Sequence, residues 1–168
     1  MKSYLLSALA RTLRDADDAL VRQRYPHPWL LWEPGRWRPP LDSTQIAVGR
    51  GAGAALAPRG KVDEALAMAL EPPKDGRPQL LLGRAPNCDL TVNDATLSRV
   101  HLLFAADAQG WSVEDAGSSN GSDLNGQPLQ PGSPRRLTPG ALLRAGDVYL
   151  TYLLSDGLLR RLREGARP

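Results

Sequence analysis

The 168-residue sequence has few of the residues that mark several common protein classes. Its single cysteine, Cys88, excludes an intrachain disulfide framework and a cysteine-rich zinc site. No apolar run approaches the roughly 20 residues that a membrane-spanning helix needs. The short apolar stretch near the start is followed at once by Arg11 and Arg14, which argues against a signal peptide. We therefore expect a cytoplasmic protein that does not contact a membrane.

Aromatic residues are also scarce, at 5% of the chain, whereas glycine and proline are frequent, at 16 and 15 residues. This composition is typical of short strands joined by loops rather than of a helical bundle. The chain has 21 Lys and Arg against 18 Asp and Glu, so its net charge is only +3. We interpret the densest basic run, at 160–163, as a solvated helix face. No recognition motif indicates nucleic-acid binding.

The N-terminal third predicts an extension rather than a second domain. Residues 2–24 have the three- and four-residue apolar spacing of an amphipathic helix, which Pro26 and Pro28 end. Its apolar face favours docking on the rest of the protein, with a surface for a partner or a second copy as the alternative. Residues 29–32 predict one short strand. The Pro- and Gly-rich residues up to 61 are interpreted as a linker.

From residue 62 the pattern changes to short apolar segments separated by turns. Apolar runs at 64–71 and 79–82 flank a Gly-containing turn and predict a hairpin. Further strands are expected at 89–92, 100–105, 111–115, 137–138, 142–144 and 148–154. This spacing predicts an all-β sandwich over 62–156. A short helix at 158–163 is expected within a basic C-terminal tail, 157–168.

Three polar loop motifs follow one another in the second half of the chain. They are Gly83 and Arg84, then Ser-Arg-Val-His at 98–101, then Ser-Ser-Asn-Gly-Ser at 118–122 with Asn-Gly at 125–126. This ordered set, with Cys-Asp-Leu at 88–90, resembles the forkhead-associated (FHA) family, small modules that bind phosphothreonine peptides. The resemblance covers about residues 62–154. It implies an FHA-like sandwich of two twisted, mainly antiparallel sheets, with the first 60 residues outside it.

The resemblance also implies which residues bind. Arg84 would grip the phosphate, Ser98 and Ser119 would contact it, Arg99 would lie near it, and Asn120 would bond the peptide backbone. A phosphate monoester near pH 7 carries about −1.5 to −2 charge and three acceptor oxygens. Guanidinium and hydroxyl donors from separate loops match that chemistry.

Other residues are expected to support the site rather than to contact the ligand. They are Gly83, His101, Gly121, Asn125 and Gly126. The resemblance gives His101 an architectural role, in which it braces the loops through hydrogen bonds. Two positions depart from the family pattern, because Ser122 replaces the usual Thr and Asp123 stands where an aromatic or apolar residue is common.

We therefore expect a phosphothreonine-dependent protein–protein interaction module that acts as an adaptor in Ser/Thr kinase signalling. Its partner would be a Thr-phosphorylated protein or peptide, such as a Ser/Thr kinase or its substrate. A phosphate-independent scaffold that uses the N-terminal helix and the tryptophan-bearing segment stays open as the alternative. No nucleophile–base set and no metal-ligand spacing are present, so we predict no enzyme, metal or cofactor. Because the motifs follow residue 82, residues 60–168 are expected to fold and bind alone.

Overall fold

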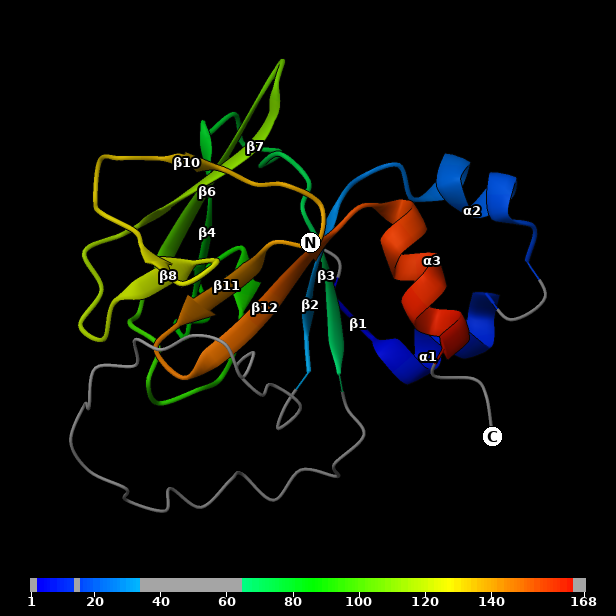
Figure 1. Ribbon diagram of the computed structural model, residues 1–168, viewed down its shortest axis with the longest axis horizontal. Helices are drawn as coiled ribbons and strands as arrows, with labels where there is room; N and C mark the ends of the chain where they lie inside the picture. Colours follow the sequence, from blue (N-terminus) through cyan, green and yellow to red (C-terminus); the bar gives the residue numbers. More distant parts are fainter. Residues whose placement is uncertain (1–2, 14–15, 34–64, 165–168) are drawn as a thin grey trace.

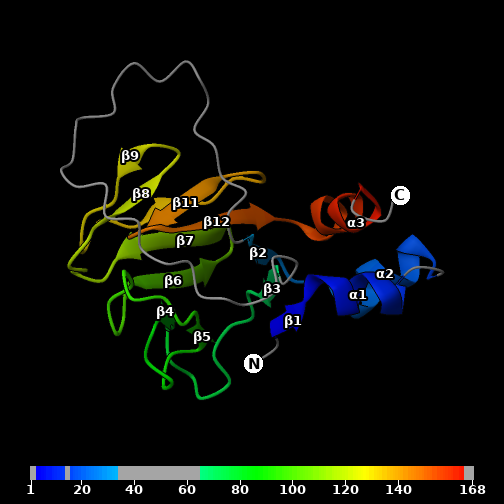
Figure 2. The same ribbon diagram turned by 90° about the horizontal axis from the view of Figure 1, so that it is seen from below.

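The computed structural model describes residues 3–13, 16–33 and 65–164 as two packed β-sheets with three helices gathered beside one end of the larger sheet (Figures 1 and 2). The larger sheet has the order β1 (Ser3–Leu5), β3 (Leu66–Ala69), β2 (Trp29–Trp32), β12 (Val148–Leu153), β11 (Leu142–Ala145), β8 (Ser122–Leu124) and β9 (Gln127–Pro128). The smaller sheet has the order β10 (Arg135–Arg136), β7 (Gly110–Asp115), β6 (Leu102–Asp107), β4 (Gln79–Gly83) and β5 (Leu90–Thr91). Only β4 and β5 pair in parallel among these strands. The predicted all-β sandwich of mainly antiparallel sheets is confirmed.

The sandwich core follows from the two-residue alternation of its strands. In β12 every second residue, beginning with Val148, is buried, as expected for a strand with one face on a core. Leu82 and Phe104 from the smaller sheet meet Leu143 and Leu150 from the larger one in a single apolar cluster. This cluster fixes the strands whose ends carry the loop motifs.

A second apolar cluster lies between the larger sheet and the helices. Strand β2 sends Leu30 into the sandwich core, whereas Trp29 and Leu31 point to the other face and pack with Leu9 of α1 (Leu6–Leu13). Leu158 of α3 (Ser155–Glu164) belongs to the same cluster. Burial on both faces explains why the segment is apolar at four successive positions. The predicted strand and the predicted C-terminal helix are both confirmed.

The single helix predicted over 2–24 is wrong. The chain instead forms strand β1, helix α1 and a second helix, α2 (Asp18–Arg24). Asp17 starts the second helix, because its carboxylate accepts from the main-chain nitrogens of Ala19 at 2.7 Å and Leu20 at 3.3 Å. Strand β1 forms because pairing with β3 outweighs local helix propensity. Docking of the apolar residues is confirmed for Leu9 and Val21, which are buried.

The predicted hairpin between 64–71 and 79–82 is also wrong. Both strands exist, but β3 pairs with β1 and β2, whereas β4 pairs with β5 and β6 in the other sheet. An apolar run specifies burial and not a partner, so the turn between the two runs misled the prediction. The strand predicted at 137–138 lies at Arg135–Arg136 instead, and the short strands β8 and β9 were not predicted.

The segment predicted as an extension contributes to the sandwich sheet itself, since β2 lies between β3 and β12. The division at residue 61 stays a prediction, because 34–64, including the predicted linker, lies outside the described residues. Within the described ranges, every helix is too short or too polar to cross a membrane.

Candidate functional site

The three loop motifs meet at one end of the sandwich because of how their strands pair. β4 and β7 each run antiparallel to β6, so the loops after β4 and β7 lie at the same end as the loop before β6. Together they line a hollow of about 690 Å³. Its lining is Arg84, Ala85, Asn87, Ala95, Thr96, Leu97, Ser98, Arg99, Val100, Gly117, Ser119 and Asn120. All five residues predicted to bind the ligand are among them.

The two arginines of the hollow are exposed, and neither side chain bonds to any residue that the structure describes. The main chain beside them is fixed, since the nitrogens of Arg84 and Ala85 donate to the oxygens of Ser98 and Arg99 at 3.1 Å each. Gly83 permits this close pairing of loops, because a Cβ there would lie 2.2 Å from the Arg99 oxygen. The guanidiniums therefore project from a rigid base.

The Ser98 hydroxyl links the second and third loops. Its Oγ accepts a hydrogen bond from the main-chain nitrogen of Ser119 at 3.0 Å. A hydroxyl that accepts in this way keeps its own hydrogen for another acceptor. Ser98 is thus oriented as a donor at the edge of the hollow, beside the exposed hydroxyl of Ser119.

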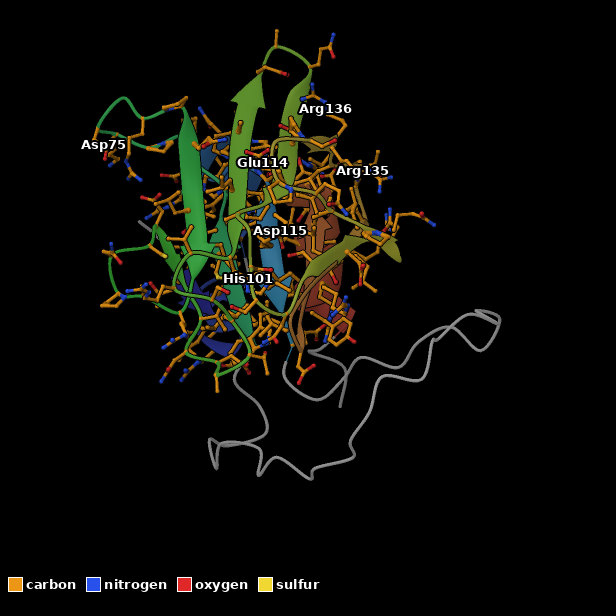
Figure 3. The ribbon with its side chains drawn as sticks, turned by 90° about the vertical axis from the view of Figure 1, so that its left-hand side faces the viewer. Asp75, His101, Glu114, Asp115, Arg135 and Arg136 are labelled. Carbon is orange, nitrogen blue, oxygen red and sulfur yellow. The ribbon has the colours of Figure 1, made fainter. Side chains whose placement is uncertain are left out.

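His101 is fully buried and, like Ser98, links the second and third loops. Its Nδ1 accepts from the Ser98 nitrogen at 2.9 Å, and its Nε2 lies 3.2 Å from the Gly121 oxygen, to which it donates. One accepting and one donating nitrogen require the neutral ring. Burial lowers the pKa of His101 below its ordinary value, which favours the same state. Figure 3 places His101 and Asp115 together, away from Arg136 near the other end of the sandwich.

Asp115, at the end of β7, shapes the third loop from within. Its carboxylate accepts from the nitrogen of Ser118 at 2.6 Å and from the hydroxyls of Ser118 at 2.7 Å and Ser122 at 2.5 Å. Burial by itself raises the pKa of Asp115, but the hydroxyl and N–H donors outweigh it and hold the pKa below its ordinary value. Ser122 uses only the hydroxyl that it shares with threonine, so this departure from the family pattern preserves the contact.

The second departure, Asp123, is neutralised inside the larger sheet. It forms an ion pair with Arg144, which lies opposite it in the pairing of β8 with β11. Its charge is therefore balanced by a neighbour. The Asn125–Gly126 turn follows, with φ of 51° and 76°, and Asn125 Oδ1 accepts from the Leu142 nitrogen at 2.8 Å. This turn holds the β8–β9 hairpin against β11.

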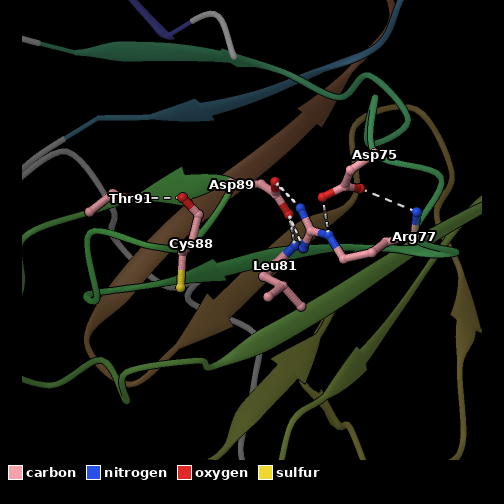
Figure 4. A network of polar contacts seen from close by, with 6 residues as sticks. All are labelled: Asp75, Arg77, Leu81, Cys88, Asp89 and Thr91. Carbon is pink, nitrogen blue, oxygen red and sulfur yellow. Dashed lines mark hydrogen bonds and ion pairs between the residues drawn. The ribbon is translucent and has the colours of Figure 1, made fainter.

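Arg77 stabilises the two ends of the first loop, where β4 leads into the loop and β5 follows it. Arg77 donates two hydrogen bonds to Asp89, at 2.8 and 3.2 Å, and a third to Asp75 at 2.6 Å (Figure 4). Asp89 also accepts from the Leu81 nitrogen at 2.8 Å, which ties β4 to the start of β5. Arg77 is thus paired with two carboxylates, whereas the Arg84 side chain bonds to no described residue.

Sequence reasoning missed two polar residues of the hollow, Asn87 and Thr96. Asn87 lies in the turn that the Cys88 nitrogen closes on the Ala85 oxygen at 3.0 Å. Thr96 is the third residue of an Asp-x-Thr sequence, which is typical of a turn in which the Asp side chain bonds the main chain two residues later. This pattern was the one sequence signal that could have indicated Thr96.

Comparison with known proteins agrees with this geometry. Residues 80–146 match the FHA domain family. The chain contains an FHA domain. The match begins in β4 and includes all three loops of the hollow as well as the β11 strand.

Individual relatives resemble the chain over the same region. Protein FraH of Nostoc sp. is 38% identical over 71 residues, which are 41% of this chain and 25% of that protein. The oxoglutarate dehydrogenase inhibitor of Corynebacterium diphtheriae is 33% identical over 77 residues, 46% of this chain and 52% of that protein. The chain thus spans about half, or less, of these relatives' own length.

A solved structure described for phosphothreonine-dependent FHA domain interactions shares the fold. It is 19% identical, has a TM-score of 0.50, and the match covers 76% of this chain and 96% of that chain. The match extends beyond residues 80–146, in agreement with a sandwich that includes strands outside that range.

Proposed function

We propose that the hollow binds threonine-phosphorylated proteins or peptides, and that the chain is a phosphothreonine-dependent interaction module. The observation that carries this proposal is the pair of unengaged guanidiniums, Arg84 and Arg99, beside the hydroxyls of Ser98 and Ser119. Cation and hydroxyl donors on a rigid base match a phosphate dianion. Asn120 takes the peptide backbone, and Gly83, His101, Gly121, Asn125 and Gly126 hold the loops.

The names of two relatives support a regulatory role. The inhibitor of oxoglutarate dehydrogenase from Corynebacterium diphtheriae and the glycogen accumulation regulator GarA of Mycolicibacterium smegmatis, 31% identical over 77 residues, are named for regulation and not for catalysis. We therefore propose an adaptor rather than an enzyme. We further propose that it is located in the cytoplasm and that its partner is a Ser/Thr kinase or a kinase substrate.

The phosphate-independent scaffold is less well supported, because the segment assigned to it is used inside the fold. Trp29 is fully buried and Leu9 is 3% exposed, both in the cluster between sheet and helices. Neither residue is available as an anchor for a partner. Most of the exposed residues in this segment are polar, and its exposed large apolar side chains are Leu5 and Leu20.

Calorimetric titration with a blocked pentapeptide tests the proposal. Its central residue is phosphothreonine, phosphoserine or threonine, and the other four are alanine. We expect binding of both phosphopeptides and none of the unphosphorylated peptide. The threonine methyl should strengthen binding about fourfold, because one buried methyl contributes about 0.8 kcal/mol. Equal binding of the phosphorylated and unphosphorylated peptides would refute phosphate dependence and favour the scaffold.

A further inference from the structure

Thr96 joins three loops at the edge of the hollow. Its hydroxyl donates to Asp94 Oδ1 at 2.6 Å and accepts from the Asp147 nitrogen at 2.9 Å, and its own main-chain nitrogen donates to Asp94 Oδ1 at 2.8 Å. Its main-chain oxygen accepts from Asn120 Nδ2 at 2.7 Å. The first three bonds fix the orientation of Thr96. The fourth bond then holds the Asn120 side chain against the fixed main-chain oxygen of Thr96.

The turn between β11 and β12 closes on the same residue. A Cβ at Gly146 would lie 2.7 Å from the Thr96 oxygen and 2.8 Å from its Oγ1, so the bare glycine backbone lies directly against Thr96. The Gly146 nitrogen also donates to the Gly121 oxygen at 3.0 Å, the atom that His101 binds. The turn therefore contacts both Thr96, to which the Asn120 side chain donates, and Gly121, the residue that follows Asn120.

The bond to Thr96 also determines which way the Asn120 carboxamide points. A main-chain oxygen only accepts, so the NH₂ group must face Thr96 and Oδ1 must take the other branch. No described residue donates to that Oδ1. An amide fixed in this way presents an acceptor to a peptide N–H with little further loss of rotamer freedom on binding.

We infer that Thr96 is a positioning residue for peptide recognition, which with Asp94 and the Gly146–Asp147 turn holds the Asn120 carboxamide toward the main chain of the phosphopeptide. This inference rests on the proposed function. It assigns to Thr96 a contribution to affinity for the peptide and not for the phosphate group. Arg84 and Ser98 are held by other contacts, namely the pairing of the first two loops and the bond from Ser119.

The test uses the full chain with Thr96→Val, which removes the hydroxyl and keeps the branched shape. The probes are the phosphothreonine pentapeptide, measured by calorimetry, and inorganic phosphate, measured from amide shifts around Ser98 and Ser119. We expect Thr96→Val to weaken peptide binding about three- to tenfold, the range for one neutral hydrogen bond, and to change phosphate binding less than about twofold. Thr96→Ser should restore wild-type affinity.

A double-mutant cycle separates positioning from a general structural effect. In an Asn120→Ala background, Thr96→Val should change peptide affinity by less than about twofold, because the group that it positions is gone. Thr12→Val is the matched control, since Thr12 makes one hydroxyl bond to the Ala8 oxygen at 3.0 Å in α1. It should leave both ligands unaffected. Additive losses from Thr96→Val and Asn120→Ala, or equal losses for peptide and phosphate, would overturn the inference.

The side-chain amide of Asn120 provides a readout that needs no ligand. In the wild type one Nδ2 proton should exchange slowly with solvent, and Thr96→Val should accelerate that exchange while the fold is retained; unchanged exchange would overturn the inference. A wild type that binds the pentapeptide equally with and without phosphate overturns both the proposed function and this role. A phosphate-dependent wild type with a silent Thr96→Val overturns this inference alone.

Discussion

Two regions of the molecule use their arginines in opposite ways: the helical end, where the three helices lie beside the larger sheet, and the loop end, which carries the hollow. Beside the larger sheet, three arginines form ion pairs that connect the N-terminal segments to the C-terminal helix. The pairs are Arg22–Asp156, Arg161–Glu33 and Arg163–Asp18. At the loop end, Arg84 and Arg99 line the hollow and bond to no acceptor in the described parts of the chain.

This difference separates charge that serves the fold from charge available to a ligand. Each paired arginine already has an acceptor, so an anion would have to compete with a carboxylate for it. An unpaired guanidinium beside oriented hydroxyls offers its full charge to a phosphate. Removing a paired arginine should therefore affect stability, and removing an unpaired arginine of the hollow should affect binding.

Deleting residues 1–59 would remove most of the helical end and should have the largest effect of these changes, a loss of folding stability. The sequence alone favours an autonomous 60–168, but the structure places β2 between β3 and β12. Trp29 and Leu30 are fully buried there, and each contributes about 1.5–3 kcal/mol. Because a domain is stable by only about 5–15 kcal/mol, we expect residues 60–168 to lack a cooperative thermal transition by circular dichroism.

A milder truncation serves as the comparison. A chain that starts at residue 16 loses β1 and α1 but keeps β2, so it should still unfold cooperatively, at a lower temperature than the full chain. Well-dispersed amide resonances and a cooperative transition from residues 60–168 would show that β2 is dispensable.

Arg84→Ala removes one cation from the hollow at the loop end and should have the next largest effect, a loss of phosphopeptide affinity. A charge-assisted contact contributes about 1.5–3 kcal/mol, so phosphopeptide affinity should fall roughly 10-fold to more than 100-fold. Stability should change little, since the exposed Arg84 side chain has no bond to a described residue. Calorimetry with the phosphothreonine pentapeptide, together with urea unfolding, measures both quantities.

Two further variants sharpen that result. Arg84→Lys should restore affinity only in part, because an ammonium does not make the planar two-oxygen contact of a guanidinium. Arg135→Ala removes another exposed arginine, one outside the hollow, and should leave affinity unchanged. Equal losses from Arg84→Ala and Arg135→Ala would mean that net charge, and not the hollow, attracts the peptide.

How far the sequence predicted the molecule also differs between the two ends. At the loop end, the resemblance of the ordered motifs to the FHA family indicated Arg84, Ser98 and Asn120, because each loop carries its own residue pattern. At the helical end, the pattern of 2–24 indicated a helix but not the Asp17 cap or the pairing of β1 with β3, since pairing depends on residues some 60 positions away. Thr96 was missed for the same reason, because its contacts to Asn120 and Asp147 exist only once the loops meet.

His101 should make stability at the loop end depend on pH. Because burial lowers the pKa of His101 in the folded chain, the unfolded chain binds more protons below about pH 6.5. The stabilisation is therefore present above that pH and is lost as the pH falls, by at most about 1.4 kcal/mol per pH unit. Urea unfolding at pH 7.5 and 5.5 should show a larger loss for the wild type than for His101→Gln.

His27, the other histidine, is present in both of those chains, so any contribution that it makes cancels in the difference. Gln at position 101 has one acceptor and one donor group, as the neutral ring does, but it does not titrate. An equal loss of stability in both chains between pH 7.5 and 5.5 would assign the pH dependence to groups other than His101.

Arg161→Ala should have the smallest effect and completes the comparison. Arg161 pairs with Glu33 across the helical end, and both side chains are partly exposed, at 22% and 24%. Ion pairs near the surface contribute about 0.2–1 kcal/mol, because solvent screens them and two long side chains must be ordered. We expect urea unfolding to show a loss within that range and calorimetry to show unchanged phosphopeptide affinity. Arg84→Ala should give the reverse, with affinity lost and stability kept. If Arg161→Ala instead weakened peptide binding, the helical end would be coupled to the hollow, and the separation between fold-serving and ligand-serving arginines would be wrong.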